Sequence, residues 1–142
     1  MTKPSIYNVK RLAGKVALVT GGSRGVGART AVILGQARAN VAINYRDKIR
    51  RAEEVAELVR RFGSRALPVK ADITSALETA EMFAKVRALF GKLDVLVLNA
   101  SGGLEKDVAP SYAMELNKTA QVRALEDAIP LMADGGRIVF VT

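Results

Sequence analysis

Residues 20–27 read TGGSRGVG, and this stretch decides the fold. The apolar run 16–19 precedes it, and a segment with apolar residues at helical spacing follows it. A strand, a glycine-rich turn and a helix N-terminus in that order form a cradle for phosphate, because backbone N–H groups and the positive end of the helix dipole face one point. The glycines are spaced G-x-x-x-G-x-G rather than G-x-G-x-x-G.

Length and composition indicate one globular domain. The 142 residues are 49% hydrophobic and 25% charged, which is ordinary for a soluble protein. The sequence contains no Cys and no His, so it offers no disulfide, no thiolate nucleophile, no imidazole base and no zinc site built on these residues. We therefore expect no metal site, and a cytoplasmic location.

The net charge of +8 is compatible with nucleic acid or an anionic cofactor as a partner, but also with an ordinary solvated surface. Arginines at 50–61 are interspersed with Glu53, Glu54 and Glu57, which is typical of a solvated helix face. No basic stretch alternates with aromatic residues, so we expect no nucleic-acid binding. No run of 18 apolar residues occurs, so we expect no membrane-spanning helix.

Strand-like and helix-like segments alternate along the chain, which predicts a parallel sheet built from βαβ units. With right-handed crossovers the strand order is 3-2-1-4-5, a Rossmann-type doubly wound α/β sheet that stops after strand five. We expect a dinucleotide-binding domain at 14–142, preceded by a flexible lead at 1–13. The expected strands are 15–20, 41–45, 66–71, 93–98 and 137–142.

Four helices are expected between these strands, each from its apolar spacing. Ser75 and Glu78 form a capping box at the start of the third helix, and Gly91 ends it. The fourth helix, 111–132, carries two apolar stripes: one packs on the sheet, and the other faces either a partner chain or another layer of the same fold. The faces expected are Val26, Thr30, Ile33, Leu34 and Ala37 in the first helix, Ala52, Val55, Ala56, Val59 and Phe62 in the second, and Leu77, Ala80, Phe83, Ala84 and Val86 in the third. The two stripes are Leu116, Ala120, Ala124, Ala128 and Leu131, and Val122, Leu125, Ile129 and Met132.

The end of the second strand favours NADP over NAD. Folds that prefer NAD carry Asp or Glu there for the ribose 2′-hydroxyl, whereas this chain has Tyr45 followed by Arg46. Arg24 lies in the glycine turn, and two guanidinium groups suit the 2′-phosphate of NADP. The alternative for Arg46 is an ordinary surface arginine.

The TGxxxGxG spacing and the run Asn99-Ala100-Ser101-Gly102 after the fourth strand resemble the short-chain dehydrogenase/reductase family of the classical type. The resemblance implies that Asp72 holds the adenine amino group beside the backbone of Ile73, the alternative being an Asx turn at a helix start. Asn99 is implied to steady the sheet, the alternative being a plain Asn-Gly turn. The implied cofactor-binding residues are Gly21, Ser23, Arg24, Gly25, Val26, Gly27, Tyr45, Arg46, Asp72, Ile73, Asn99, Ala100 and Ser101.

The same resemblance implies a catalytic Asn at Asn117, which helps to relay protons. The family's Ser and Tyr-x-x-x-Lys would follow Thr142, and no Tyr of this chain has a Lys four residues later. We therefore expect the cofactor-binding half of an NADP-dependent oxidoreductase that transfers hydride between nicotinamide and a small carbonyl or secondary alcohol. Alone, the chain should bind NADP weakly and turn nothing over. The alternative is a non-catalytic dinucleotide-binding or interaction module.

Oligomerisation is expected for two reasons. The open apolar edge at 138–141 invites pairing with another chain, and the resembled family commonly forms dimers or tetramers. We expect a homo-oligomer, or a marginally stable and aggregation-prone chain.

Overall fold

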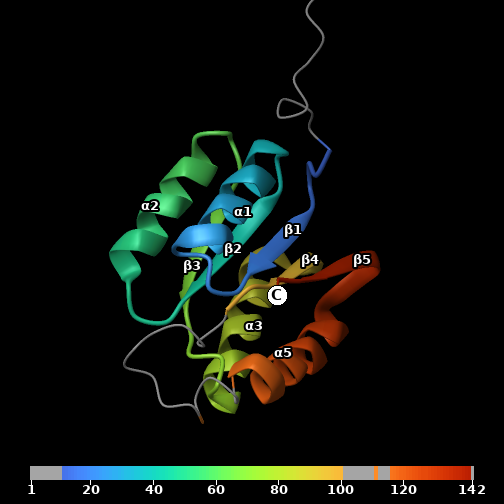
Figure 1. Ribbon diagram of the computed structural model, residues 1–142. Coiled ribbons are helices and arrows are strands. Elements are labelled where there is room, and N and C mark those ends of the chain that lie inside the picture. The colour runs from blue at the N-terminus through green and yellow to red at the C-terminus, as the bar shows by residue number, and fades with distance from the viewer. Residues whose placement is uncertain (1–10, 101–110, 112–115, 142) are drawn as a thin grey trace, which may run out of the picture.

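The computed structural model describes residues 11–100, 111 and 116–141, and the side chains of all of these except Leu116 and Asn117. Strands and helices alternate along the chain (Figure 1). The elements are β1 (Val16–Val19), α1 (Gly25–Gln36), β2 (Asn40–Tyr45), α2 (Ile49–Arg60), β3 (Ala66–Lys70), α3 (Ala76–Phe90), β4 (Leu93–Leu98), the π-helical turn η2 (Leu116–Ala120), α5 (Gln121–Ala128), the 3-10 turn η3 (Ile129–Leu131) and β5 (Met132–Phe140).

The five strands form one parallel sheet in the order β3-β2-β1-β4-β5, which confirms the predicted topology. Helices α1 and α2 cover one face and α3 and α5 cover the other (Figure 1). The central strands are buried on both sides: Leu18 and Leu96 belong to the core under α3 and α5, and Val19 and Val97 to the core under α1 and α2. Because parallel strands end at one edge, the residues after β1, β2, β3 and β4 gather there.

The predicted face of α1 is mostly wrong, although its Leu34 does pack against the core. Val26 and Ile33 are 61% and 46% exposed, whereas Gly27, Ala31 and Gly35 are buried. The reason is close packing on α2, since a Cβ on Gly35 would lie 2.9 Å from a methyl carbon of Val59. Apolar residues lie all round α1, so their spacing did not distinguish the face that packs through its smallest side chains.

The buried faces of α2 and α3 agree better with the sequence pattern than that of α1 does. In α2 the buried residues are Ala52, Val55, Ala56 and Val59, as predicted, but Phe62 lies past the end of the helix and is half-buried. In α3, Phe83 and Val86 are buried as predicted, whereas Leu77, Ala80 and Ala84 of the predicted face are exposed. The unpredicted Thr79 and Met82 are buried instead. Ser75 Oγ accepts a hydrogen bond from the Glu78 N–H at 3.2 Å, and Gly91 ends the helix with φ +78°.

The C-terminal elements depart from the predicted boundaries. The first stripe of the fourth helix packs inward through Ala120, Ala124, Ala128 and Leu131, but the helix ends before Met132. Strand β5 begins at Met132, five residues earlier than predicted, because Met132 pairs with Leu93. The pairing is irregular at 133–136 and resumes where Arg137 pairs with Val95.

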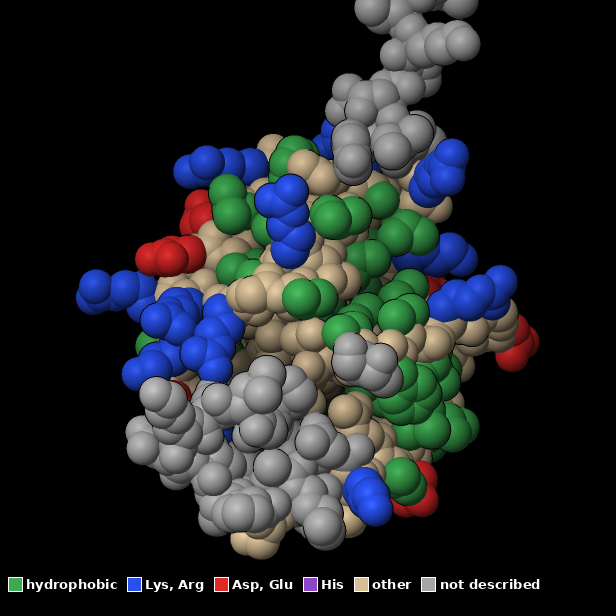
Figure 2. Space-filling view, viewed as in Figure 1, with side chains coloured by type: hydrophobic (Ala, Val, Ile, Leu, Met, Phe, Trp, Pro, Cys, Tyr) green, Lys and Arg blue, Asp and Glu red, His purple; other side chains and the backbone are tan. Residues whose placement is uncertain are grey.

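The outer edge of the sheet is apolar and exposed, as predicted. Ile138, Val139 and Phe140 of the edge strand β5 are 39%, 46% and 55% exposed, and Val122 and Ile129 of the predicted second stripe are also exposed. Figure 2 shows hydrophobic side chains gathered over this side of the molecule. The described helices are all too short or too polar to cross a membrane.

The amino end of the sheet is held by a buried carboxylate. Asp94 is 6% exposed and accepts a hydrogen bond from the Val16 N–H at 2.8 Å, so it joins β4 to the start of β1. The Lys92 ammonium lies 3.1 Å from the same carboxylate oxygen, but its side chain is 42% exposed.

Replacing Asp94 by Ala should lower the free energy of unfolding by about 1–3 kcal/mol, because the Val16 N–H is left without its partner. The matched variant Lys92→Ala keeps that hydrogen bond and should cost no more than about 1 kcal/mol, as for other partly exposed ion pairs. Urea denaturation measures both values. Equal losses in the two variants would show that the ion pair, not the hydrogen bond, stabilises this end of the sheet.

Candidate functional site

The glycine turn after β1 is held from both sides at one residue, Gly21. The Gly21 N–H donates to Asn44 Oδ1 at 3.1 Å, and Asn99 Nδ2 donates to the Gly21 carbonyl at 3.1 Å. The Gly22 N–H donates to the main-chain carbonyl of Asn44 at 2.8 Å. Gly21 has φ +61°, a conformation that glycine adopts without steric cost.

Thr20 joins the turn to the loop after β4. Its side chain is fully buried, and its Oγ1 donates to the Val97 carbonyl at 3.3 Å. The same oxygen accepts from the N–H groups of Asn99, at 2.9 Å, and Ala100, at 3.1 Å. One hydroxyl therefore orients the start of the loop that faces the glycine turn.

The turn leads directly into α1. Arg24 is the N-cap residue, and the first main-chain hydrogen bond of the helix runs from the Ala28 N–H to the Arg24 carbonyl at 3.2 Å. The N–H groups at the start of an α-helix have no partner within the helix, so they are available to an anion at this edge of the sheet. A Cβ on Gly25, which has φ +57°, would meet no atom within 4 Å, so its backbone is open to a ligand.

Gly27 serves packing rather than access. A Cβ there would collide with the Gly21 carbonyl oxygen and with Asn99 Nδ2. The third glycine of the motif therefore lets the first turn of α1 lie against the hydrogen bond between Asn99 and Gly21.

Arg24 and Arg46 both lie at the carboxyl edge of the sheet and are exposed. Arg46 pairs with Asp47 at 3.1 Å, and Tyr45 before it is 9% exposed at the end of β2. Figure 2 shows Lys and Arg side chains gathered on the side of the molecule where α2 begins. This edge is therefore positively charged next to the glycine turn.

Asp72 adopts the Asx turn that the sequence left open as an alternative. Its Oδ1 accepts from the Thr74 N–H at 2.9 Å and from the Thr74 hydroxyl at 2.7 Å. The Asp72 N–H donates to the Glu78 carboxylate at 3.3 Å, so Glu78 does not complete the capping box with Ser75. The side chain of Ile73 is buried in the core, which leaves its backbone as the group for the predicted adenine contact.

Two predicted site residues are outside the described part of the chain. Ser101 is one, and the side chain of the predicted catalytic Asn117 is the other, although its backbone belongs to η2. Among the described residues no group of His, Cys, Asp and Glu side chains is arranged to hold a metal ion.

The residue that the sequence analysis missed is Asn44. It is 2% exposed, and its Nδ2 donates to the carbonyls of Ala71, at 3.1 Å, and Val69, at 3.4 Å, while its Oδ1 holds Gly21. The available signal was an Asn in an otherwise apolar strand, since a buried amide requires partners.

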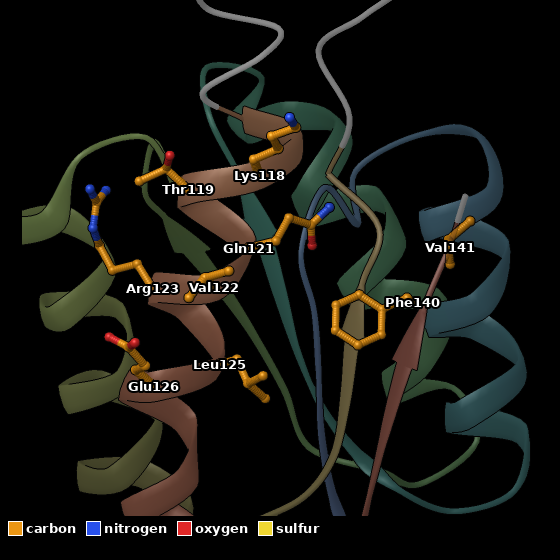
Figure 3. A pocket seen from close by; sticks show the side chains of 9 residues that line it. All are labelled: Lys118, Thr119, Gln121, Val122, Arg123, Leu125, Glu126, Phe140 and Val141. Carbon is orange, nitrogen blue, oxygen red and sulfur yellow. The ribbon is translucent and has the colours of Figure 1, made fainter.

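A cavity of about 700 Å³ lies between α5 and the end of β5, and its lining residues do not include the glycine turn. In Figure 3, Gln121 and Leu125 extend from α5 toward Phe140 of β5. This surface is mostly apolar, in contrast to the polar and positively charged edge around the glycine turn. The residues that line the cavity are Lys118, Thr119, Gln121, Val122, Arg123, Leu125, Glu126, Phe140 and Val141.

Comparison with known proteins gives one family. Residues 15–142 match the family model for short chain dehydrogenases. The short chain dehydrogenase/reductase nsrJ of Aspergillus novofumigatus is 39% identical over 148 residues, an alignment that covers 100% of this chain and 55% of that protein. The chain therefore spans about half the length of the curated relatives that it matches.

Solved structures agree with this match. A short chain dehydrogenase from Burkholderia cenocepacia, in complex with NADP, superposes with a TM-score of 0.83 at 37% identity, covering 92% of this chain and 56% of that one. The angucycline C-6 ketoreductase LanV with bound NADP superposes with a TM-score of 0.82 at 37% identity, covering 93% and 56%.

Replacing Gly27 by Ala should lower the free energy of unfolding by about 1–3 kcal/mol, because the new methyl group cannot fit without moving the turn. Ile33→Ala, also in α1 but at an exposed position, should change it by no more than about 0.5 kcal/mol. Urea denaturation of both variants tests this. If Gly27→Ala is as stable as Ile33→Ala, the close approach of α1 to the turn is not required.

Proposed function

Since the chain belongs to the short-chain dehydrogenase/reductase family, we propose that it forms the cofactor-binding part of an NADP-dependent oxidoreductase. The reaction proposed for the whole protein is hydride transfer between the nicotinamide ring of NADP and a carbonyl or secondary alcohol of a small molecule. The observation that carries this proposal is the glycine turn at the carboxyl edge of the sheet. Asn44 and Asn99 hold this turn at Gly21, and it leads into α1, whose first N–H groups can bind an anion.

The residues at this edge fit a dinucleotide phosphate. Gly25 leaves room for a ligand to approach the backbone, and the helix N-terminus favours negative charge. Thr20 fixes the backbone of Asn99 and Ala100 after β4, and Asn99 in turn holds Gly21. These groups bind and orient a cofactor; within this proposal Asn117 takes part in proton relay.

The preference for NADP over NAD is proposed from charge. Arg24 and Arg46 follow adjacent strands, β1 and β2, where the adenosine ribose of a dinucleotide would lie. A ribose 2′-phosphate would compete with Asp47 for the Arg46 guanidinium and gain charge-assisted hydrogen bonds. The NADP-bound structures of similar proteins support this choice.

A cytoplasmic location and a homo-oligomeric state complete the proposal. The lack of Cys supports the first. The exposed apolar side chains on β5 and α5 support the second.

NADPH binding by the 142-residue chain tests the proposal directly. Replacing Arg24 and Arg46 together by Ala should weaken NADPH binding about tenfold or more, because charge-assisted hydrogen bonds to the 2′-phosphate are lost. Binding of NADH, which has no 2′-phosphate, should change little. Isothermal titration calorimetry with each nucleotide measures both affinities.

The double variant Arg61→Ala, Arg87→Ala is the matched control for this experiment. Both arginines are exposed and lie at the C-terminal ends of α2 and α3, at the opposite ends of these helices from the glycine turn, so their loss removes two positive charges without touching the site. Equal weakening by the control would indicate general attraction of anions. Equal loss of NADPH and NADH binding in the double variant would contradict recognition of the 2′-phosphate.

A further inference from the structure

Asn44 is a buried polar residue that connects two parts of the site that are distant in the sequence. Its side chain lies between the ends of β1 and β3, and it contacts the glycine turn on one side and the strand end before Asp72 on the other. We propose that Asn44 is a positioning residue for the cofactor, which holds the glycine turn and the adenine-side loop in one fixed relation. This inference rests on the function proposed above.

The surroundings of Asn44 require an amide. On one side the Gly21 N–H needs an acceptor, and on the other side the carbonyls of Val69 and Ala71 need donors. A primary amide supplies one carbonyl oxygen and two N–H groups, whereas a carboxylate supplies only acceptors and a hydroxyl only one donor. The main chain of Asn44 adds a second contact to the turn through its carbonyl and the Gly22 N–H.

This arrangement shows which backbone N–H groups of the glycine turn are used within the protein and which are left for a phosphate. The N–H groups of Gly21 and Gly22 are both used within the protein, at 3.1 Å and 2.8 Å, so they do not bind phosphate. The phosphate donors are instead the N–H groups at 25–27, in the first turn of α1. Asn44 thus acts on the cofactor without touching it, by setting where that turn begins.

Asn44→Leu removes the amide while keeping a side chain of similar size, and Asn40→Leu is the matched control. Asn40 is at the other end of the same strand, where its Oδ1 accepts from the Arg65 N–H at 2.9 Å. We expect Asn44→Leu to weaken NADPH binding about tenfold or more, since it removes the acceptor that holds the Gly21 N–H and so fixes the turn. We expect Asn40→Leu to change the affinity less than about twofold, although both variants lower the melting temperature.

The calorimetric outcomes separate this inference from the proposed function. If the unaltered chain does not bind NADPH, the proposed function fails, and this role for Asn44 fails with it. If the unaltered chain binds NADPH and Asn44→Leu binds it equally well, only the role of Asn44 is overturned. Equal weakening in both variants also overturns it, because the effect would then follow general destabilisation.

Amide hydrogen exchange of the unaltered chain provides a test that does not depend on whether Asn44→Leu folds. Without NADPH, the Gly21 amide should exchange as slowly as the amides of β1, because its partner is within the protein. Addition of NADPH should slow exchange at 25–27 and leave Gly21 unchanged. A Gly21 amide that exchanges fast alone and slowly with NADPH would overturn the role of Asn44.

Discussion

The backbone of Gly21 is the point on which the arrangement of the site depends. Asn44 binds its N–H and Asn99 binds its carbonyl, so strands β2 and β4 hold the turn that follows β1 from both sides. The close approach of Gly27 to that carbonyl sets the position of α1. Side chains on or next to strands of the sheet therefore fix the orientation of the α1 N-terminus through their hydrogen bonds to the turn. The positive end of the helix dipole then points in one direction.

Much of the fold could be predicted because the sheet is parallel and buried on both faces. The almost continuously apolar run 93–98, interrupted only by Asp94, indicates a strand buried on both faces, and the observed β4 has those bounds. Helix α2 was predicted correctly because its polar and apolar faces are distinct. Helix α1 was not, since it is apolar all round and packs through Gly27, Ala31 and Gly35, where a small side chain rather than a large one marks the buried face.

The candidate site could be predicted where its residues lie close together in the sequence or directly follow a strand. The glycine spacing and the arginines follow strand ends in order, so topology brings Arg24 and Arg46 to one edge. Asn44 was not found, because its role depends on carbonyls 25 and 27 residues away in the chain, on β3 and just past it. The start of β5 was also missed, because the irregular pairing at 133–136 carries no apolar alternation.

The two surfaces of the molecule divide by chemistry. The hydrogen bonds around the glycine turn involve residues on or next to β1, β2, β3 and β4, and they satisfy buried polar groups within that part of the sheet. The exposed side of β5 and α5 is apolar, with Phe140 55% exposed beside the cavity. Phosphate recognition needs hydrogen-bond donors in fixed positions, whereas burial of an apolar surface is favourable against any apolar partner that excludes water. Among the described residues, the side chains that hold Gly21 are Asn44 and Asn99, and neither belongs to β5. Strand β4, which leads to Asn99, pairs with β5 along Val97 and Leu98, so the apolar edge and the cradle are joined through β4.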